Sequence, residues 1–133
     1  FDKTSQEAIA VIDLDTVMPG IVLSDFGDMV RTFTNSGEED EANFSDVEMR
    51  RDIFEALKEG FLTEMKDLTK LERIHLFDGA KWIVLMQAIR FLTDFLEGDI
   101  YYKTEYLTHN LVRTKNQLAL FDSIELINDN TLI

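Results

Sequence analysis

The chain has 133 residues, 45% of them hydrophobic, which is enough to build one domain with a real core. Its 26 acidic residues outnumber the 13 lysines and arginines and give a net charge of -13. This balance argues against nucleic acid as a partner, because phosphates would be repelled. Cysteine is absent, which excludes disulfides and thiolate chemistry.

No apolar run reaches the ~20 residues that a membrane-spanning helix needs. The longest run, residues 82–95, is interrupted by Gln87, Arg90 and Asp94. The first residues show no basic region followed by a hydrophobic block, which a signal peptide would require. We therefore expect a cytoplasmic protein without a membrane partner.

The first 23 residues predict a short β-hairpin. "AIAVIDL" is rich in Ile and Val, and a second extended segment, "IVL", follows a Met-Pro-Gly turn. From Ser24 the pattern becomes helical, with Ser24 as the expected N-cap and Asp25 as an acid of the first turn. The polar residues 34–45 predict a solvated loop, including the acidic run 38–41.

The remaining chain predicts helices. Two capping boxes, Ser45–Glu48 and Thr69–Glu72, mark helix starts. A long apolar helix over 79–97, ending at Gly98, should be the most buried, with Trp82 in the core. A final helix is expected over 105–127. The predicted fold is mainly α with a short N-terminal β-hairpin (α+β), divided into residues 1–23 and a helical part, 24–133.

Two acids, Asp13 and Asp15, end the first extended segment. Because side chains alternate along a strand, both carboxylates would lie on the same face. Such a pair can hold Mg²⁺, which is commonly bound by one or two carboxylates plus substrate phosphates. The alternative is that each acid caps a turn or pairs with a lysine.

The whole stretch "AVIDLDTVMPGIVLSDFGDMVRT" closely resembles the aminoglycoside-phosphotransferase-like kinase family. In that family a strand ending in Ile-Asp-x-Asp is followed by a glycine-containing turn and an Asp that opens a helix. "IRFLTDFLEGDIYY", at 89–102, is similar to the N-acetylhexosamine kinase branch. The resemblance implies a phosphotransferase that uses ATP or another nucleoside triphosphate, with Mg²⁺, to phosphorylate a sugar hydroxyl.

The resemblance assigns roles to five residues. Asp13 matches the metal-binding aspartate, and Asp15 matches the second acid, close to metal or substrate. Asp25 matches an aspartate that supports the catalytic loop. Arg90 and Tyr101 match positions that hold the sugar. The alternatives are an ion pair between Arg90 and Asp94, four residues along, and an ordinary half-buried connector aromatic for Tyr101.

Phosphoryl transfer also needs an acid beside the acceptor hydroxyl and a cradle for the nucleotide. The family's His-x-Asp loop is not found at His75 or His109, and we expect both to be ordinary polar or core residues. We therefore expect residues 1–133 to be a C-terminal lobe fragment of a protein-kinase-like fold, with the catalytic base upstream of Phe1. Such a fragment would be inactive alone, would lack its N-terminal lobe, and would self-associate through residues 1–23.

Two alternatives stay open from the sequence. The acceptor could be a cationic molecule such as an aminoglycoside or choline, which the negative charge of the chain would suit. The chain could also be a non-catalytic acidic helical interaction module, because the long apolar helix over 79–97 could serve a partner.

Overall fold

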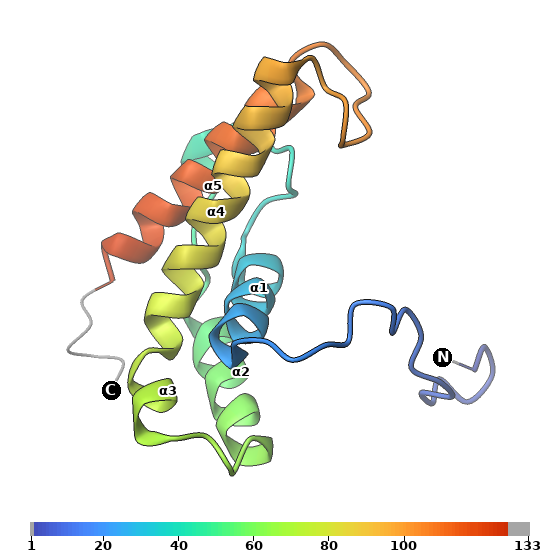
Figure 1. Cartoon of the computed structure of the whole chain (residues 1–133), viewed down its shortest axis with the longest axis vertical. Helices are drawn as coiled ribbons and strands as arrows, with labels where there is room; N and C mark the ends of the chain where they lie inside the picture. The colour runs from blue at the N-terminus through green and yellow to red at the C-terminus, as the bar shows by residue number, and fades with distance from the viewer. Residues whose placement is uncertain (1, 128–133) are drawn as a thin grey trace.

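The computed structural model describes residues 2–127 and is mainly helical, as predicted. Residue 1 and residues 128–133, at the two ends of the predicted parts, lie outside the described chain. Figure 1 shows α4 and α5 side by side, with α1 against α4. Within the described residues, no helix has both the length and the apolar character needed to cross a membrane. The elements are α1 (Val22–Thr34), the 3-10 helix η1 (Phe44–Asp46), α2 (Arg51–Glu64), α3 (Lys70–Ile74), α4 (Leu76–Glu97) and α5 (His109–Glu125).

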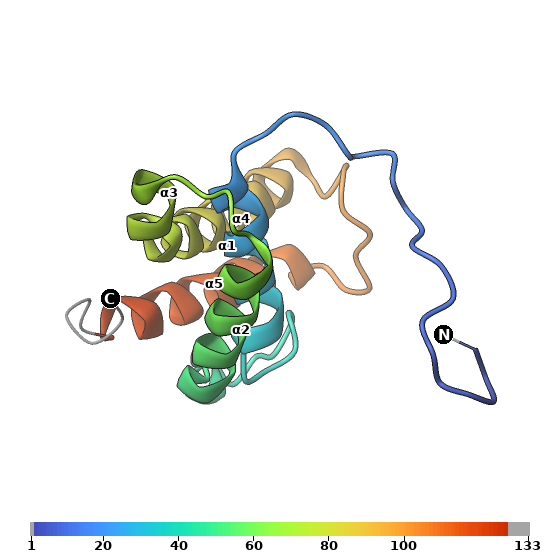
Figure 2. The ribbon, with the colours of Figure 1, turned by 90° about the horizontal axis from the view of Figure 1, so that it is seen from below.

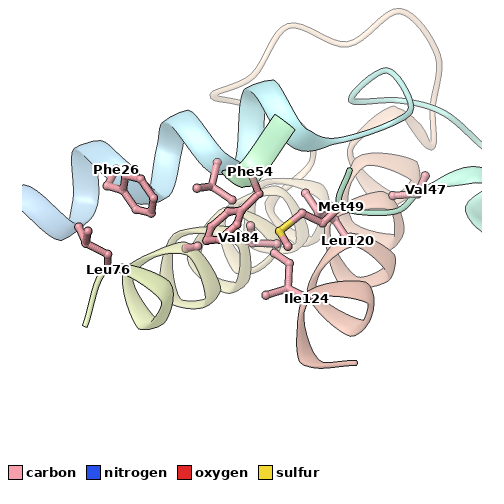
Figure 3. Close-up of a cluster of buried hydrophobic side chains, with 10 residues drawn as sticks. Phe26, Val47, Met49, Phe54, Leu76, Val84, Leu120 and Ile124 are labelled. Carbon is pink, nitrogen blue, oxygen red and sulfur yellow. The ribbon is translucent and has the colours of Figure 1, made fainter. Parts of the chain in front are cut away.

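The hydrophobic core lies where α4 meets α1, α2 and α5 (Figure 3). Phe26 of α1 and Phe54 of α2 are both buried and meet edge to face, with ring centroids 6.1 Å apart. Val84 of α4 and Leu120 of α5 complete the cluster from the other side. Burial of these side chains is what holds the helices together.

Two glycines let α1 and α4 touch. A Cβ on Gly27 would collide with the carbonyl oxygen of Gly79 and lie 2.7 Å from Cγ1 of Ile83. A Cβ on Gly79 would lie 2.6 Å from the carbonyl oxygen of Leu23. The tripeptide Asp25-Phe26-Gly27 is therefore a packing element of α1, with Asp25 exposed in the first turn.

Residues 2–21 form no strand, so the two extended segments of the predicted hairpin do not pair with each other in this structure. A turn does close where the hairpin loop was expected, with the Asp2 amide donating to Glu7 O at 2.9 Å and the Gln6 amide donating to Asp2 O at 3.0 Å. The segment then runs away from the helices (Figures 1 and 2). Its large apolar side chains are exposed, for example Val11 at 80%. A strand needs a partner for its amides and apolar faces, and the described helices offer none.

The helix starts agree with the predicted caps at one place out of three. Thr69 forms the predicted capping box, since its hydroxyl accepts from the Glu72 amide at 3.2 Å and Glu72 Oε2 accepts from the Thr69 amide at 2.7 Å. Ser24 is wrong as an N-cap, because α1 begins at Val22 without a side-chain cap. Ser45 is also wrong. It lies in η1, and the following chain is drawn into an extended bridge between Met49 and Asn35 before α2 begins.

The long helix α4 ends at Gly98, as predicted, where φ of 94° suits glycine. It begins at Leu76, three residues before the expected start. One face is buried, but Trp82 is 50% exposed, so its predicted core position is wrong. The reason is that α1 and α5 cover only part of the helix circumference, and an apolar stripe remains uncovered. This α4 stripe consists of Trp82, Leu85, Ile89, Leu92 and Leu96.

Candidate functional site

A cavity of about 360 Å³ opens at the C-terminal end of α4. It lies between the last turns of the helix and the connector that follows Gly98. Arg90 and Tyr101, the two residues matched to sugar binding, both line it. The full lining is Ile89, Arg90, Thr93, Asp94, Glu97, Tyr101 and Tyr102.

Arg90 lies beside two aromatic rings. Its guanidinium carbon is 5.8 Å from the ring centroid of Tyr101 and 5.5 Å from that of Tyr102. The two rings meet edge to face with centroids 4.9 Å apart. A guanidinium near aromatic faces keeps its charge and most of its N–H donors available for a ligand. Arg90 and Tyr101 are thus brought together, as the sequence predicted only one by one.

The alternative ion pair between Arg90 and Asp94 is not formed. Asp94 is instead buried, at 4% exposure, and accepts backbone hydrogen bonds from Ile100 at 3.0 Å, Tyr101 at 2.7 Å and Tyr102 at 3.0 Å. The Asn110 side-chain amide adds a fourth bond at 2.8 Å. Burial pushes the pKa of Asp94 up, but these hydrogen bonds outweigh it, so the pKa is lower than usual. Asp94 therefore holds the connector that carries both tyrosines.

Gln87 joins the helix to the same connector. Its side chain is nearly buried, and its Nε2 donates to the Tyr102 hydroxyl at 3.1 Å. Its Oε1 accepts from Nη1 of Arg90 at 3.3 Å. Sequence reasoning assigned no role to Gln87 and gave Asp94 only the alternative ion pair. The available signal was that both are polar residues inside an otherwise apolar helix.

The acids Asp13 and Asp15 lie on the exposed N-terminal segment and do not line this cavity. Asp13 has φ of 64°, in the left-handed region, so the alternation of an extended strand is interrupted there. The predicted common strand face for the two carboxylates is therefore not formed. Carboxylate oxygens do suit Mg²⁺. Among the described residues, however, no group of three His, Cys, Asp or Glu side chains comes together around them.

The acidic run 38–41, predicted to be a solvated loop, is docked on α5. Glu39 pairs with Arg31 at 3.0 Å and with Arg113 at 3.5 Å, so it links α1 to α5. His109 is 3% exposed, and its Nε2 lies 3.3 Å from Asp40. The Asn116 side-chain amide donates to Glu38 O at 2.9 Å. The prediction failed because the polar partners come from a helix about 70 residues further along the chain.

No model of a known protein family matches the chain. The candidate site is thus defined by its geometry. The structure brings Arg90 and Tyr101 into one cavity, with Gln87, Asp94 and Tyr102 as their supports. It leaves the matched acids 13, 15 and 25 outside that cavity.

Proposed function

We propose that the chain is the C-terminal part of a small-molecule kinase that transfers the γ-phosphate of a nucleotide to a sugar hydroxyl, with an N-acetylhexosamine as acceptor. The observation that carries the proposal is the cavity in which Arg90 lies beside Tyr101 and Tyr102. Sugars are recognised by hydrogen-bond donors together with aromatic surfaces, and this cavity supplies both.

The charge of the cavity favours a sugar over a cationic acceptor. Asp94 already accepts four hydrogen bonds from the protein, so its carboxylate is occupied. Arg90 forms no ion pair among the described residues and contributes an uncompensated positive charge beside the opening. An aminoglycoside or choline would be repelled by this guanidinium, whereas a neutral or anionic acceptor would not.

The metal and nucleotide belong to the same proposal. Asp13 and Asp15 would supply carboxylate oxygens to Mg²⁺, which keeps nucleotide phosphates in place when bound. The left-handed φ of Asp13 supports a special role, because non-glycine residues in that region are enriched at functional sites. Figure 2 shows the N-terminal segment and the connector after α4 on the same side of the helices, which suits one shared active centre.

The test is a phosphorylation assay on the complete polypeptide to which the chain is proposed to belong. With ATP, Mg²⁺ and N-acetylglucosamine or N-acetylgalactosamine, Asp13→Asn should abolish nearly all turnover while circular dichroism stays unchanged. Asp67→Asn, at an exposed acid between α2 and α3, is the matched control and should retain full turnover. Full activity of Asp13→Asn would disprove the metal role, and turnover by residues 1–133 alone would disprove the proposed boundary.

A second candidate function is an interaction module, and the α4 stripe favours it. Its residues follow one another at intervals of three and four, the spacing by which one helix packs on another. Absence of any sugar binding or phosphorylation in the assay above, with a folded protein, would favour this function over the kinase.

A further inference from the structure

We propose that Gln87 is the residue that positions Arg90 in the cavity. The proposal rests on the proposed function for its effect on sugar binding, but its structural part stands alone. Gln87 is 9% exposed and comes from α4, one turn before Arg90. Its side-chain amide is the single hydrogen-bond acceptor that the described residues present to the Arg90 guanidinium.

The amide of Gln87 is itself fixed in orientation. Its Nε2 donates to the Tyr102 hydroxyl, so its Oε1 is directed to Arg90. Tyr102 is immobilised in turn, since Asp94 accepts from its backbone amide and its ring packs on Phe91 with centroids 4.7 Å apart. The chain of contacts from Asp94 through Tyr102 and Gln87 therefore ends at Arg90.

Arg90 needs such a support because nothing stronger holds it. It is exposed, and it has no carboxylate partner among the described residues. Contact with two tyrosine rings limits its distance from the connector, but a ring face does not fix the direction of the N–H groups. One hydrogen bond at Nη1 sets the rotation of the planar guanidinium and leaves its other donors for the ligand.

The experiment compares Gln87→Met with Gln87→Glu. Met keeps the length and apolar stem but accepts no comparable hydrogen bond. Glu keeps an acceptor for Arg90 and can accept from the Tyr102 hydroxyl. The direct readout is the ¹⁵N relaxation of the Arg90 side chain, measured in residues 1–133. The second readout is the affinity of the complete polypeptide for N-acetylglucosamine.

We expect Gln87→Met to give Arg90 the mobility of an unrestrained surface arginine and to weaken sugar binding by about tenfold, because the donors are no longer preoriented. Gln87→Glu should retain Arg90 order and affinity within about threefold. Tyr102→Phe keeps the ring but removes the hydroxyl that orients Gln87, and should loosen Arg90 as well. This variant keeps the test valid if Gln87→Met does not fold.

Unchanged Arg90 relaxation in Gln87→Met and in Tyr102→Phe would overturn the positioning role, whatever the sugar does. The same holds if Gln87→Glu loosens Arg90 as much as Gln87→Met does. If Arg90 loosens as expected but the unsubstituted protein binds no sugar, the positioning role is supported and the proposed function fails. The two proposals can therefore fail separately.

Discussion

Gly27 and Gly79 bring the backbones of α1 and α4 into direct contact, closer than any side chain would allow. This contact fixes how α1 crosses the helix that carries the candidate site. It also explains the Asp-Phe-Gly tripeptide at 25–27 without any metal, since Phe26 fills the core and Gly27 admits the neighbouring helix.

Replacing Gly27 by Ala should therefore destabilise the chain. The added methyl group would overlap the Gly79 carbonyl, and the helices would have to separate. We expect the free energy of unfolding to fall by roughly 2–3 kcal/mol, the cost of overpacking a core. Urea denaturation followed by circular dichroism measures it.

Gly60→Ala is the matched control. Gly60 lies in α2, and an added Cβ there meets no atom within 4 Å. Because alanine favours the helix, this variant should gain roughly 0.5–1 kcal/mol. Equal loss of stability in both variants would show that the Gly27–Gly79 contact has no special importance.

Asp94→Asn should destabilise the chain in a pH-dependent way. The pKa of Asp94 is lowered in the folded chain, so its charge contributes stability above the ordinary value of 3.8. That contribution is lost as the pH falls below 3.8 and the carboxylate becomes protonated. The difference in melting temperature between the unsubstituted chain and Asp94→Asn should therefore be larger at pH 7 than at pH 3. Asp67→Asn, at an exposed acid, is the control. A difference that does not depend on pH would contradict the role of the Asp94 charge.

Thr69→Ala should cost about 1 kcal/mol of stability, because the hydroxyl of Thr69 caps α3. Ser45→Ala tests the other sequence motif of the same kind. Ser45 caps no helix here, and its hydroxyl bonds only to Asn43 at 2.8 Å, so we expect a change within ~0.5 kcal/mol. Thermal or urea unfolding of both variants distinguishes the real cap from the apparent one. Equal losses would show that the helix start at Arg51 is misplaced.

The chain should self-associate through its N-terminal segment, as the exposed strand-forming sequence predicts. Val11 is 80% exposed on a segment that has no partner. Val11→Asp should lower the sedimentation coefficient at high protein concentration toward that of a monomer, because a charged residue discourages strand pairing. Leu107→Asp, at a residue 90% exposed in the connector before α5, should leave association unchanged. A monomer at all concentrations would contradict the prediction.

The sequence predicted the helices better than their ends. Local signals sufficed for the stop at Gly98 and the cap at Thr69, because both depend on residues within one turn. They failed at Ser45, where Met49 pairs with Asn35 and its burial draws the chain into an extended form. Long-range contacts of this kind leave no local pattern.

The candidate site was predictable in outline. Gln87, Arg90 and Asp94 are the three residues that interrupt the apolar run of α4, and all three take part in the site. Their polarity was visible in the sequence, but their partners were not. The hydrogen bonds of Asp94 depend on the turn at Gly98, which brings the connector back over the helix.

The docked segment 38–41 has a consequence for how much the chain can change in length. Glu39 joins Arg31 at the end of α1 to Arg113 on α5, and the Asn116 amide grips the backbone beside it. Most surface loops accept insertions at small cost, because longer loops lose little extra entropy on closing. Here an added or deleted residue would pull the carboxylate away from one arginine. Homologues with natural length variation should therefore show it elsewhere, and a protease cut at this point would loosen the attachment of α5.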